Sequence, residues 1–295
     1  MESEVAFYSE GERVAGTLCL PDRIRDKAPA VALLHGYSSF RDDLRGFVEL
    51  AALLADHGIA SLRFDFRGCG SSGEPGRFHP HDEWIEDARA ALSYLEGRPE
   101  VDAGRLGLAG ISVGGGVTVG AAALDPRVRC AVALCPVADG GWWLEHLWTG
   151  LGGRPAWEKF LDRLAADRRR RAREGASAKV PMEEILAFGP EGLAAWRKMR
   201  EEFPRFASGA YLSSPDSLLS FQPRHLVHRI APRPLRIIHS LADASVPFHH
   251  AAELYGRAGE IKDLVVIRDS PHCFWTGDDN RRVQELTLEW LERYL

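Results

Sequence analysis

The sequence predicts an α/β fold in which a mostly parallel, twisted sheet has helices on both faces and carries one helical insertion as a cap. Two observations lead to this fold class. Short apolar runs alternate with helical hydrophobic patterns through most of the chain, which is typical of parallel strands joined by crossover helices. The alternation breaks between residues 138 and 225 and then resumes, as expected for an insertion into a continuous scaffold. A chain of 295 residues fits one large domain with such an insertion.

The first 66 residues contain four strand-like runs. The first two are separated by the polar turn Ser9-Glu10-Gly11-Glu12 and predict an antiparallel hairpin. The other two are short and continuously apolar, as in strands that are buried on both faces. Between them, apolar residues from 47 to 54 recur at spacings of three and four, which predicts an amphipathic helix ending near Gly58. The four strand-like runs are residues 5–8, 13–20, 30–34 and 60–66.

The rest of the chain outside the insertion continues the same alternation of strands and helices. Each strand-like run is short and apolar, and each is followed by a stretch with helical spacing of its apolar residues. The predicted strands are residues 106–109, 128–134, 235–239 and 264–267. The predicted helices are residues 84–95, 113–123, 246–257 and 281–294.

The insertion is expected to form a cap that selects the substrate. It holds five of the eight tryptophans. Trp142 and Trp143 follow directly on the strand that ends near residue 135, so they and Trp148 are expected to contact the substrate, because small-molecule pockets are lined mainly by aromatic and apolar groups. The alternative is that these tryptophans form the cap's own small core. The expected division is a core domain of residues 1–137 and 226–295 and a cap of residues 138–225.

Composition and charge exclude several functional classes. The formal net charge is −5, whereas a protein that binds nucleic-acid phosphates needs a strongly basic face. The same charge gives no attraction to anionic membranes, and no apolar run approaches the ~20 residues that span a bilayer. The first residues, MESEVAFYSE, lack the basic and apolar regions of a signal peptide. We therefore expect a soluble cytoplasmic protein that binds neither nucleic acid nor membranes.

The five cysteines indicate neither a disulfide framework nor a metal site. They are odd in number, scattered and without a C-x-x-C pair, which is typical of reduced thiols in a cytoplasmic protein. Cys130 and Cys135 lie in an apolar strand-like run, where a cysteine is expected to act as a small hydrophobic side chain. His79 and His81 form an H-x-H pair, but no third ligand accompanies them at metal-binding spacing. The sequence therefore predicts no metal site.

The most specific motif is the G-x-S-x-G string of residues 110–114, with Ser112 at its centre. A predicted strand leads into it and a predicted helix leads out. This context indicates a tight strand–turn–helix elbow that exposes the serine hydroxyl, while the small flanking residues relieve crowding. The N-terminus of the following helix favours negative charge that develops at the same point. Ser112 is therefore the candidate nucleophile, and the alternative is an ordinary serine in a glycine-rich turn.

A serine nucleophile needs a base that is itself oriented by an acid, and in elbow enzymes the order is serine, acid, histidine. Asp243 follows the predicted strand 235–239, and His272 follows the predicted strand 264–267. Both lie where open α/β sheets bind their ligands, at the carboxyl ends of strands. Asp139, after an earlier strand, is an alternative acid in a permuted arrangement.

The negative charge on the reacting oxygen requires two backbone donors. One is expected to be the N–H of Val113, directly after the nucleophile. The other is expected from the loop after the first parallel strand, and the N–H of Tyr37 suits it best. Gly36, which precedes Tyr37, lets the backbone approach the acyl oxygen closely.

Together these motifs resemble the α/β-hydrolase superfamily over most of the chain outside the cap. The strings that carry the resemblance are Leu33-Leu34-His35-Gly36, residues 63–73, the elbow, and the loops of Asp243 and His272. The chain looks most similar to bacterial serine hydrolases grouped with dienelactone-hydrolase-like, feruloyl-esterase-like and serine-aminopeptidase-like members. The resemblance implies an α/β-hydrolase fold, a Ser112–His272–Asp243 triad and no cofactor.

The function expected from these residues is cleavage of a small-molecule carboxylic ester through an acyl-enzyme on Ser112. An acyltransferase, a thioesterase or a peptidase would use the same three residues, because water, alcohols and amines can all capture an acyl-enzyme. The remaining alternative is a binding protein on a retained hydrolase scaffold. Homo-oligomerisation is compatible with the sequence, although no interface stripe stands out.

Overall fold

The computed structural model describes residues 1–42, 46–274 and 277–295. The strands of its central sheet are β1 (Glu2–Ser9), β2 (Glu12–Cys19), β3 (Ala28–Leu34), β4 (Ala60–Phe64), β5 (Val101–Ile111), β6 (Val128–Leu134), β9 (Leu235–Ser240) and β10 (Lys262–Ile267). They are arranged in the order β1-β2-β4-β3-β5-β6-β9-β10. β2 pairs antiparallel with β1 and with β4, and the other neighbouring strands pair in parallel. The predicted α/β class with a mostly parallel sheet is confirmed.

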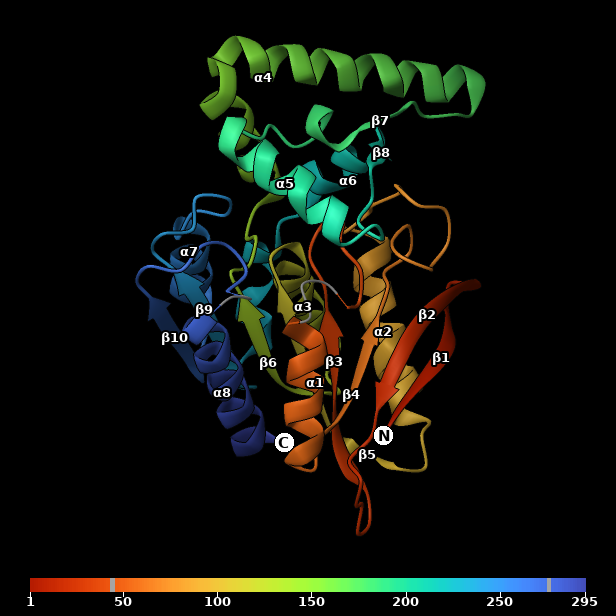
Figure 1. Ribbon diagram of the computed structural model, residues 1–295, viewed down its shortest axis with the longest axis vertical. Coiled ribbons are helices and arrows are strands. Elements are labelled where there is room, and N and C mark those ends of the chain that lie inside the picture. The colour runs from red at the N-terminus through yellow and green to blue at the C-terminus, as the bar shows by residue number, and fades with distance from the viewer. Residues whose placement is uncertain (43–45, 275–276) are drawn as a thin grey trace.

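Helices cover both faces of this sheet (Figure 1). The helices α1 (Gly46–Asp56) and α8 (Gly277–Tyr294) contact each other on one face. On the other face lie α2 (Glu83–Glu96), α3 (Val113–Leu124) and α7 (His249–Arg257), with α3 packed between α2 and the strands β5 and β6. Within the described ranges, no helix combines the length and the apolar character that crossing a membrane requires.

The two hydrophobic cores result from the alternation of side chains along each strand. In β3, Val31 and Leu33 pack with α1 and α8. Ala30, Ala32 and Leu34 point the other way and pack with α2 and α3. All five side chains are completely buried. This arrangement explains why the predicted parallel strands are continuously apolar rather than alternating in polarity.

The insertion forms a separate layer above the carboxyl ends of the strands (Figure 1). It consists mainly of helices, together with a two-stranded antiparallel sheet that the hydrophobic pattern did not predict. Its long first helix bends at Gly152 and Gly153, where the backbone leaves helical geometry, and Pro155 follows the bend. The elements are α4 (Gly140–Glu174), β7 (Lys179–Pro181), α5 (Pro190–Glu202), β8 (Gly209–Tyr211) and α6 (Ser214–Ser220).

The two ends of the insertion lie side by side on the core. The N–H of Gly140 donates to the carbonyl of Phe221 at 2.8 Å, and the N–H of Arg224 donates to the carbonyl of Ala138 at 3.2 Å. The Asp139 carboxylate and the Arg224 guanidinium form an ion pair at 2.6 Å. The chain therefore leaves the core and returns to it at one point.

Two buried arginines, one in the loop after β3 and one on β4, pair with carboxylates of β1. Arg41 pairs with the fully buried Asp65 at 2.8 Å and with Glu4 of β1 at 2.5 Å. Arg63 of β4 pairs with Glu2 of β1 at 2.7 Å. Since a buried charge is costly unless it is paired, these carboxylates fix the position of β1 across the sheet.

Candidate active site

The central feature of the site is the sharp turn between β5 and α3. Ser112 lies at this turn with φ 58° and ψ −123°, a left-handed conformation that a residue with a side chain rarely adopts. Such a conformation costs about 1–3 kcal/mol and persists only where the surrounding structure imposes it. Here the N–H of Ser112 donates to the carbonyl of Leu134 at 2.9 Å and so ties the turn to β6. The predicted elbow geometry is present.

The two glycines of the elbow motif are required by close packing. A methyl group on Gly110 would overlap the carbonyl oxygen of Gly114 and the hydroxyl of Thr118. One on Gly114 would overlap the carbonyl oxygens of Leu34 and His35, at the end of β3. These atoms belong to backbone or to a short side chain, so they cannot move aside cheaply. The motif spacing thus follows from how closely α3 approaches the sheet.

The structure brings the three predicted residues into one hydrogen-bonded chain. The Oγ of Ser112 lies 3.0 Å from Nε2 of His272, and Nδ1 of His272 lies 2.6 Å from Oδ2 of Asp243. They come from the ends of β5, β10 and β9, which are neighbours or near neighbours in the sheet. Ser112 is only 6% exposed, while the His272 side chain is 20% exposed. The catalytic roles of the three residues stay a prediction.

The Asp243 carboxylate is held by its own loop. Its Oδ1 accepts hydrogen bonds from the N–H groups of Ser245 and Val246 at 2.9 and 2.8 Å. The buried His239 of β9 lies with Nε2 2.8 Å from the Val246 carbonyl and 3.5 Å from Oδ2 of Asp243. No sequence pattern distinguishes His239, because it lies inside an apolar strand. Its position supports the loop that carries Asp243.

In the hydrogen-bonded chain of Ser112, His272 and Asp243, opposite charges stabilise each other. Burial alone would raise the pKa of Asp243, but the neighbouring His272 and the hydrogen bonds to the carboxylate outweigh it and lower the pKa. Burial likewise opposes a charge on His272, but negative charge available at Cys135 and Asp243 outweighs it and raises the pKa. Asp243 is therefore ionised at neutral pH, where it accepts the Nδ1 proton of His272.

The loop after β3 lies directly against the serine. An ideal Cβ on Gly36 would stand 3.5 Å from Cβ of Ser112 and 3.9 Å from its Oγ, so this backbone borders the reacting hydroxyl. Tyr37 follows in the same loop, and Val113 begins α3 beside it. The positions suit the N–H groups of Tyr37 and Val113 as donors to an oxyanion, which stays a prediction.

The neutral side chain of His35 holds the loop after β3 in place. His35 is completely buried, and its Nε2 accepts a hydrogen bond from the N–H of Phe66 at 3.1 Å. Its Nδ1 therefore carries the proton and donates to the carbonyl of Gly36 at 2.8 Å. Burial lowers the pKa of His35 to about 4, so the neutral form is retained at pH 7. The His35-Gly36 pair thus has a structural role in addition to the turn that the sequence indicated.

The three cap tryptophans lie in different surroundings. Trp143 is 5% exposed; its Nε1 donates to the carbonyl of Ser245 at 2.7 Å, and its ring lies edge-on to Tyr37 with centroids 6.5 Å apart. Trp142 stacks on His146 at the surface. Trp148 stacks on a cap phenylalanine and belongs to the cap's own core, which is the alternative that the sequence left open. Trp143, which touches both the Tyr37 loop and the Asp243 loop, is the best placed to contact a substrate.

Two further side chains near the site have structural roles. Asp139, the alternative acid, caps α4 by accepting the N–H of Trp142 at 3.0 Å and pairs with Arg224. His250 of α7 is fully buried and accepts the N–H of Ala138 at 3.2 Å. Both residues fix the point at which the insertion leaves the core.

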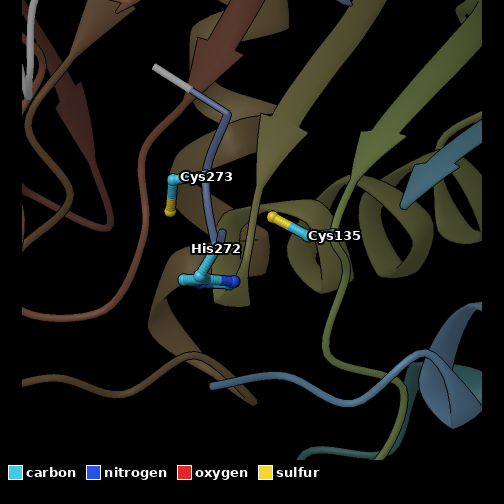
Figure 2. Close-up of side chains that lie close together, drawn as sticks. All are labelled: Cys135, His272 and Cys273. Atoms are coloured by element: carbon cyan, nitrogen blue, oxygen red, sulfur yellow. The ribbon is translucent and has the colours of Figure 1, made fainter. Parts of the chain in front are cut away.

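Cys135 is buried in the hydrophobic core as expected, but it has a second set of neighbours. It lies just beyond β6, which ends at Leu134, and has φ 35°. Its thiol lies beside His272, and the thiol of Cys273 lies next to both (Figure 2). The sequence spacing could not show this, because 137 positions separate Cys135 from His272.

Comparison with known proteins agrees with this geometry. The profile described as the Alpha/beta hydrolase family matches residues 31–286, which is most of the chain. The chain belongs to the α/β-hydrolase family. The family therefore accounts for the core together with the insertion, and the expected resemblance is confirmed.

Several members of the α/β-hydrolase family are similar over nearly the whole chain. The polyketide transferase GrgF of a Penicillium species is 24% identical, covering 91% of this chain and 89% of its own. The thiohydrolase AneE of Aspergillus aculeatus is 25% identical, covering 92% and 86%. Crystal structures of GrgF and of ferulic acid-bound Est1E from Butyrivibrio proteoclasticus have TM-scores of 0.82 and 0.70 at 23% and 19% identity. They cover 100% and 98% of this chain, and 99% and 98% of their own.

Proposed function

We propose that this α/β hydrolase is a serine hydrolase that cleaves a small-molecule carboxylic ester through an acyl-enzyme on Ser112. The observation that carries the proposal is the hydrogen-bonded chain from Ser112 through His272 to Asp243, with distances of 3.0 and 2.6 Å. A serine hydroxyl is a poor nucleophile unless an adjacent base takes its proton, and these distances are within hydrogen-bonding reach.

In the first half of the reaction, Nε2 of His272 accepts the Ser112 proton while Oγ attacks the ester carbonyl carbon. Asp243 keeps the ring in the tautomer that leaves Nε2 unprotonated, and it stabilises the imidazolium that forms. The tetrahedral oxyanion receives hydrogen bonds from the N–H groups of Val113 and Tyr37, with the N-terminus of α3 directed at the same charge. The intermediate collapses, His272 protonates the leaving alcohol, and the acyl group remains on Oγ.

In the second half, water takes the place of the alcohol. His272 accepts a proton from the water as it attacks the acyl carbonyl, and the same N–H groups stabilise the second oxyanion. Collapse of this intermediate releases the carboxylic acid and returns the proton to Oγ. All groups in this cycle come from the chain itself, so the proposal requires no cofactor.

A thioester or an acceptor other than water is the second candidate. Two relatives are named a polyketide transferase and a thiohydrolase, so acyl transfer and thioester cleavage are considered beside ester hydrolysis. Ser112 is 6% exposed beneath the cap, and a site that excludes bulk water favours capture of the acyl group by a bound acceptor. The acyl-enzyme is common to both candidates.

The activated serine is tested by intact mass after incubation with a fluorophosphonate probe. We expect one adduct on the wild type and none on Ser112→Ala, whose ester turnover should fall by on the order of 10⁶. Ser61→Ala is the matched control: Ser61 is also buried, lies on β4, and its hydroxyl has no hydrogen-bond partner among the residues that the structure describes. Equal labelling of the wild type and Ser112→Ala would contradict the proposal.

The bond and the acceptor are separated with matched substrates. An oxygen ester and a thioester of the same acyl group are compared by kcat/KM, each with and without an added alcohol or amine. Ester hydrolysis with little transfer supports the first candidate. A thioester preference, or transfer exceeding hydrolysis, supports the second candidate and contradicts ester hydrolysis as the main activity.

A further inference from the structure

Two thiols and an imidazole meet beside the candidate nucleophile. Cys135 follows β6, and His272 and Cys273 follow β10. One ligand atom from each of the three lies within 4.8 Å of the other two. Figure 2 shows the sulfur atoms of Cys135 and Cys273 turned toward the same region next to the His272 ring. Cys135 is completely buried, whereas His272 and Cys273 are partly exposed, so a small ion can approach from the His272 loop.

The hydrogen bonds around His272 decide which of its nitrogens can bind a ligand. Nδ1 donates to Asp243 at 2.6 Å, so in the neutral ring the lone pair lies on Nε2. Histidines that bind metals usually donate their other ring N–H to a carboxylate, which fixes the tautomer and raises the basicity of the binding nitrogen. Asp243 already supplies that carboxylate here. The arrangement that makes His272 a base also makes it a ready metal ligand.

The chemistry of the donors selects the kind of ion. Two thiolates and one imidazole are ligands that favour Zn²⁺, whereas Mg²⁺ and Ca²⁺ prefer oxygen ligands. We propose that Cys135, His272 and Cys273 form an inhibitory site for a thiophilic divalent cation, with Zn²⁺ as its ligand. Three protein ligands leave the fourth tetrahedral position to water. Both cysteines bind as thiolates and His272 binds through the Nε2 lone pair, so any proton that these three atoms carry passes to solvent, and the hydrogen bond from Ser112 to Nε2 is broken.

The functional consequence rests on the proposed serine hydrolase activity. A cation on Nε2 uses the lone pair that would accept the Ser112 proton, so the nucleophile loses its base. Zinc binding and acylation of Ser112 then exclude each other. Binding of the metal itself does not depend on Ser112, and this separates a test of the site from a test of the activity.

Binding is measured first, with Co²⁺ as a spectroscopic substitute for Zn²⁺ and with Zn²⁺ in calorimetry. The proteins are the wild type, Ser112→Ala, Cys135→Ala and Cys273→Ala. Cys130→Ala is the matched control, because Cys130 is a buried cysteine within β6, five residues before Cys135. Circular dichroism checks that each variant is folded. The second measurement is Zn²⁺ inhibition of fluorophosphonate labelling, with each variant compared with its own metal-free rate.

We expect one Co²⁺ per chain, with the thiolate-to-metal absorption band, in the wild type, Ser112→Ala and Cys130→Ala. Cys135→Ala and Cys273→Ala should lose the band, and their Zn²⁺ affinity should fall by more than ~10-fold, since loss of even an indirect support costs that much. Mg²⁺ should have no effect. Absence of the band in the wild type, or equal binding by the two cysteine variants, would overturn the site. If the fluorophosphonate probe fails to label the wild type while the thiolate-to-metal band is present, the proposed activity is refuted and the metal site is retained.

Discussion

Burial of His250 should make the protein lose stability as the pH falls. His250 begins the buried side of α7, and its Nδ1 accepts the N–H of Ala138 at 3.2 Å. Burial lowers its pKa from 6.5 to about 3. Below pH 6.5, His250 therefore binds a proton in the unfolded chain but stays neutral in the folded chain. The free energy of unfolding falls until the pH reaches about 3.

The size of the effect follows from these pKa values. Between pH 7 and pH 5 a histidine with a folded pKa near 3 takes about 2 kcal/mol from the free energy of unfolding. The groups that face His250 act in both directions. His249, His239 and His146 lower its pKa further, and Asp243 raises it. A loss of about 2 kcal/mol is a large part of the stability of an ordinary domain.

The test is urea unfolding of the wild type and His250→Asn at pH 7 and pH 5. Asparagine cannot titrate, and its Oδ1 can replace Nδ1 as the acceptor for Ala138. Its smaller volume lowers stability equally at both pH values, so the difference between them isolates the proton. We expect the loss from pH 7 to pH 5 to be about 2 kcal/mol smaller in His250→Asn. His249→Asn, whose side chain is 55% exposed, is the control. An unchanged pH dependence in His250→Asn would refute the reasoning.

Three further substitutions test the packing around the site. Gly114→Ala should lower the free energy of unfolding by about 1–3 kcal/mol in urea titrations, because its methyl group would overlap two carbonyl oxygens at the end of β3. Arg41→Leu should cost about 3–5 kcal/mol, because it leaves the fully buried Asp65 carboxylate without its partner at 2.8 Å; unchanged unfolding would contradict this. Gly36→Ala should leave unfolding within about 0.5 kcal/mol, since its methyl group meets Ser112 at an ordinary 3.5 Å. The same methyl group should lower kcat/KM by about 10²-fold, and full activity would argue against this loop as a boundary of the reacting carbonyl.

The sequence predicted the sheet and the three central side chains because local patterns determine them. Buried parallel strands must be apolar, and an elbow at the end of a strand must contain small residues, so β5 and Ser112 could be recognised from composition and spacing. The positions of Asp243 and His272 followed from the rule that parallel strands end at the same edge. The alternation also placed most strand boundaries within a few residues of their observed positions.

What the sequence could not show depends on contacts between distant segments. Cys135 lies in an apolar run and has the pattern of a core residue, and only the folded chain brings its thiol to His272. His239 has the pattern of a core residue, and only the Val246 carbonyl shows that it supports the acid loop. Trp148 and Trp143 are equivalent by composition, yet one lies in the cap core and the other between two active-site loops. No periodicity distinguishes such partners.

The hydrogen bonds that join Ala138 to Arg224 and Gly140 to Phe221 have an evolutionary consequence. Because the intervening 85 residues, from position 139 to 223, begin and end at one closed junction, their length and sequence can vary with little entropic cost to the scaffold. Recombination between homologous genes at these two positions would exchange residues 139–223 and leave the strand order of the sheet intact. The junction therefore makes the layer above the carboxyl ends of the strands separable, as a unit of inheritance, from the sheet beneath it.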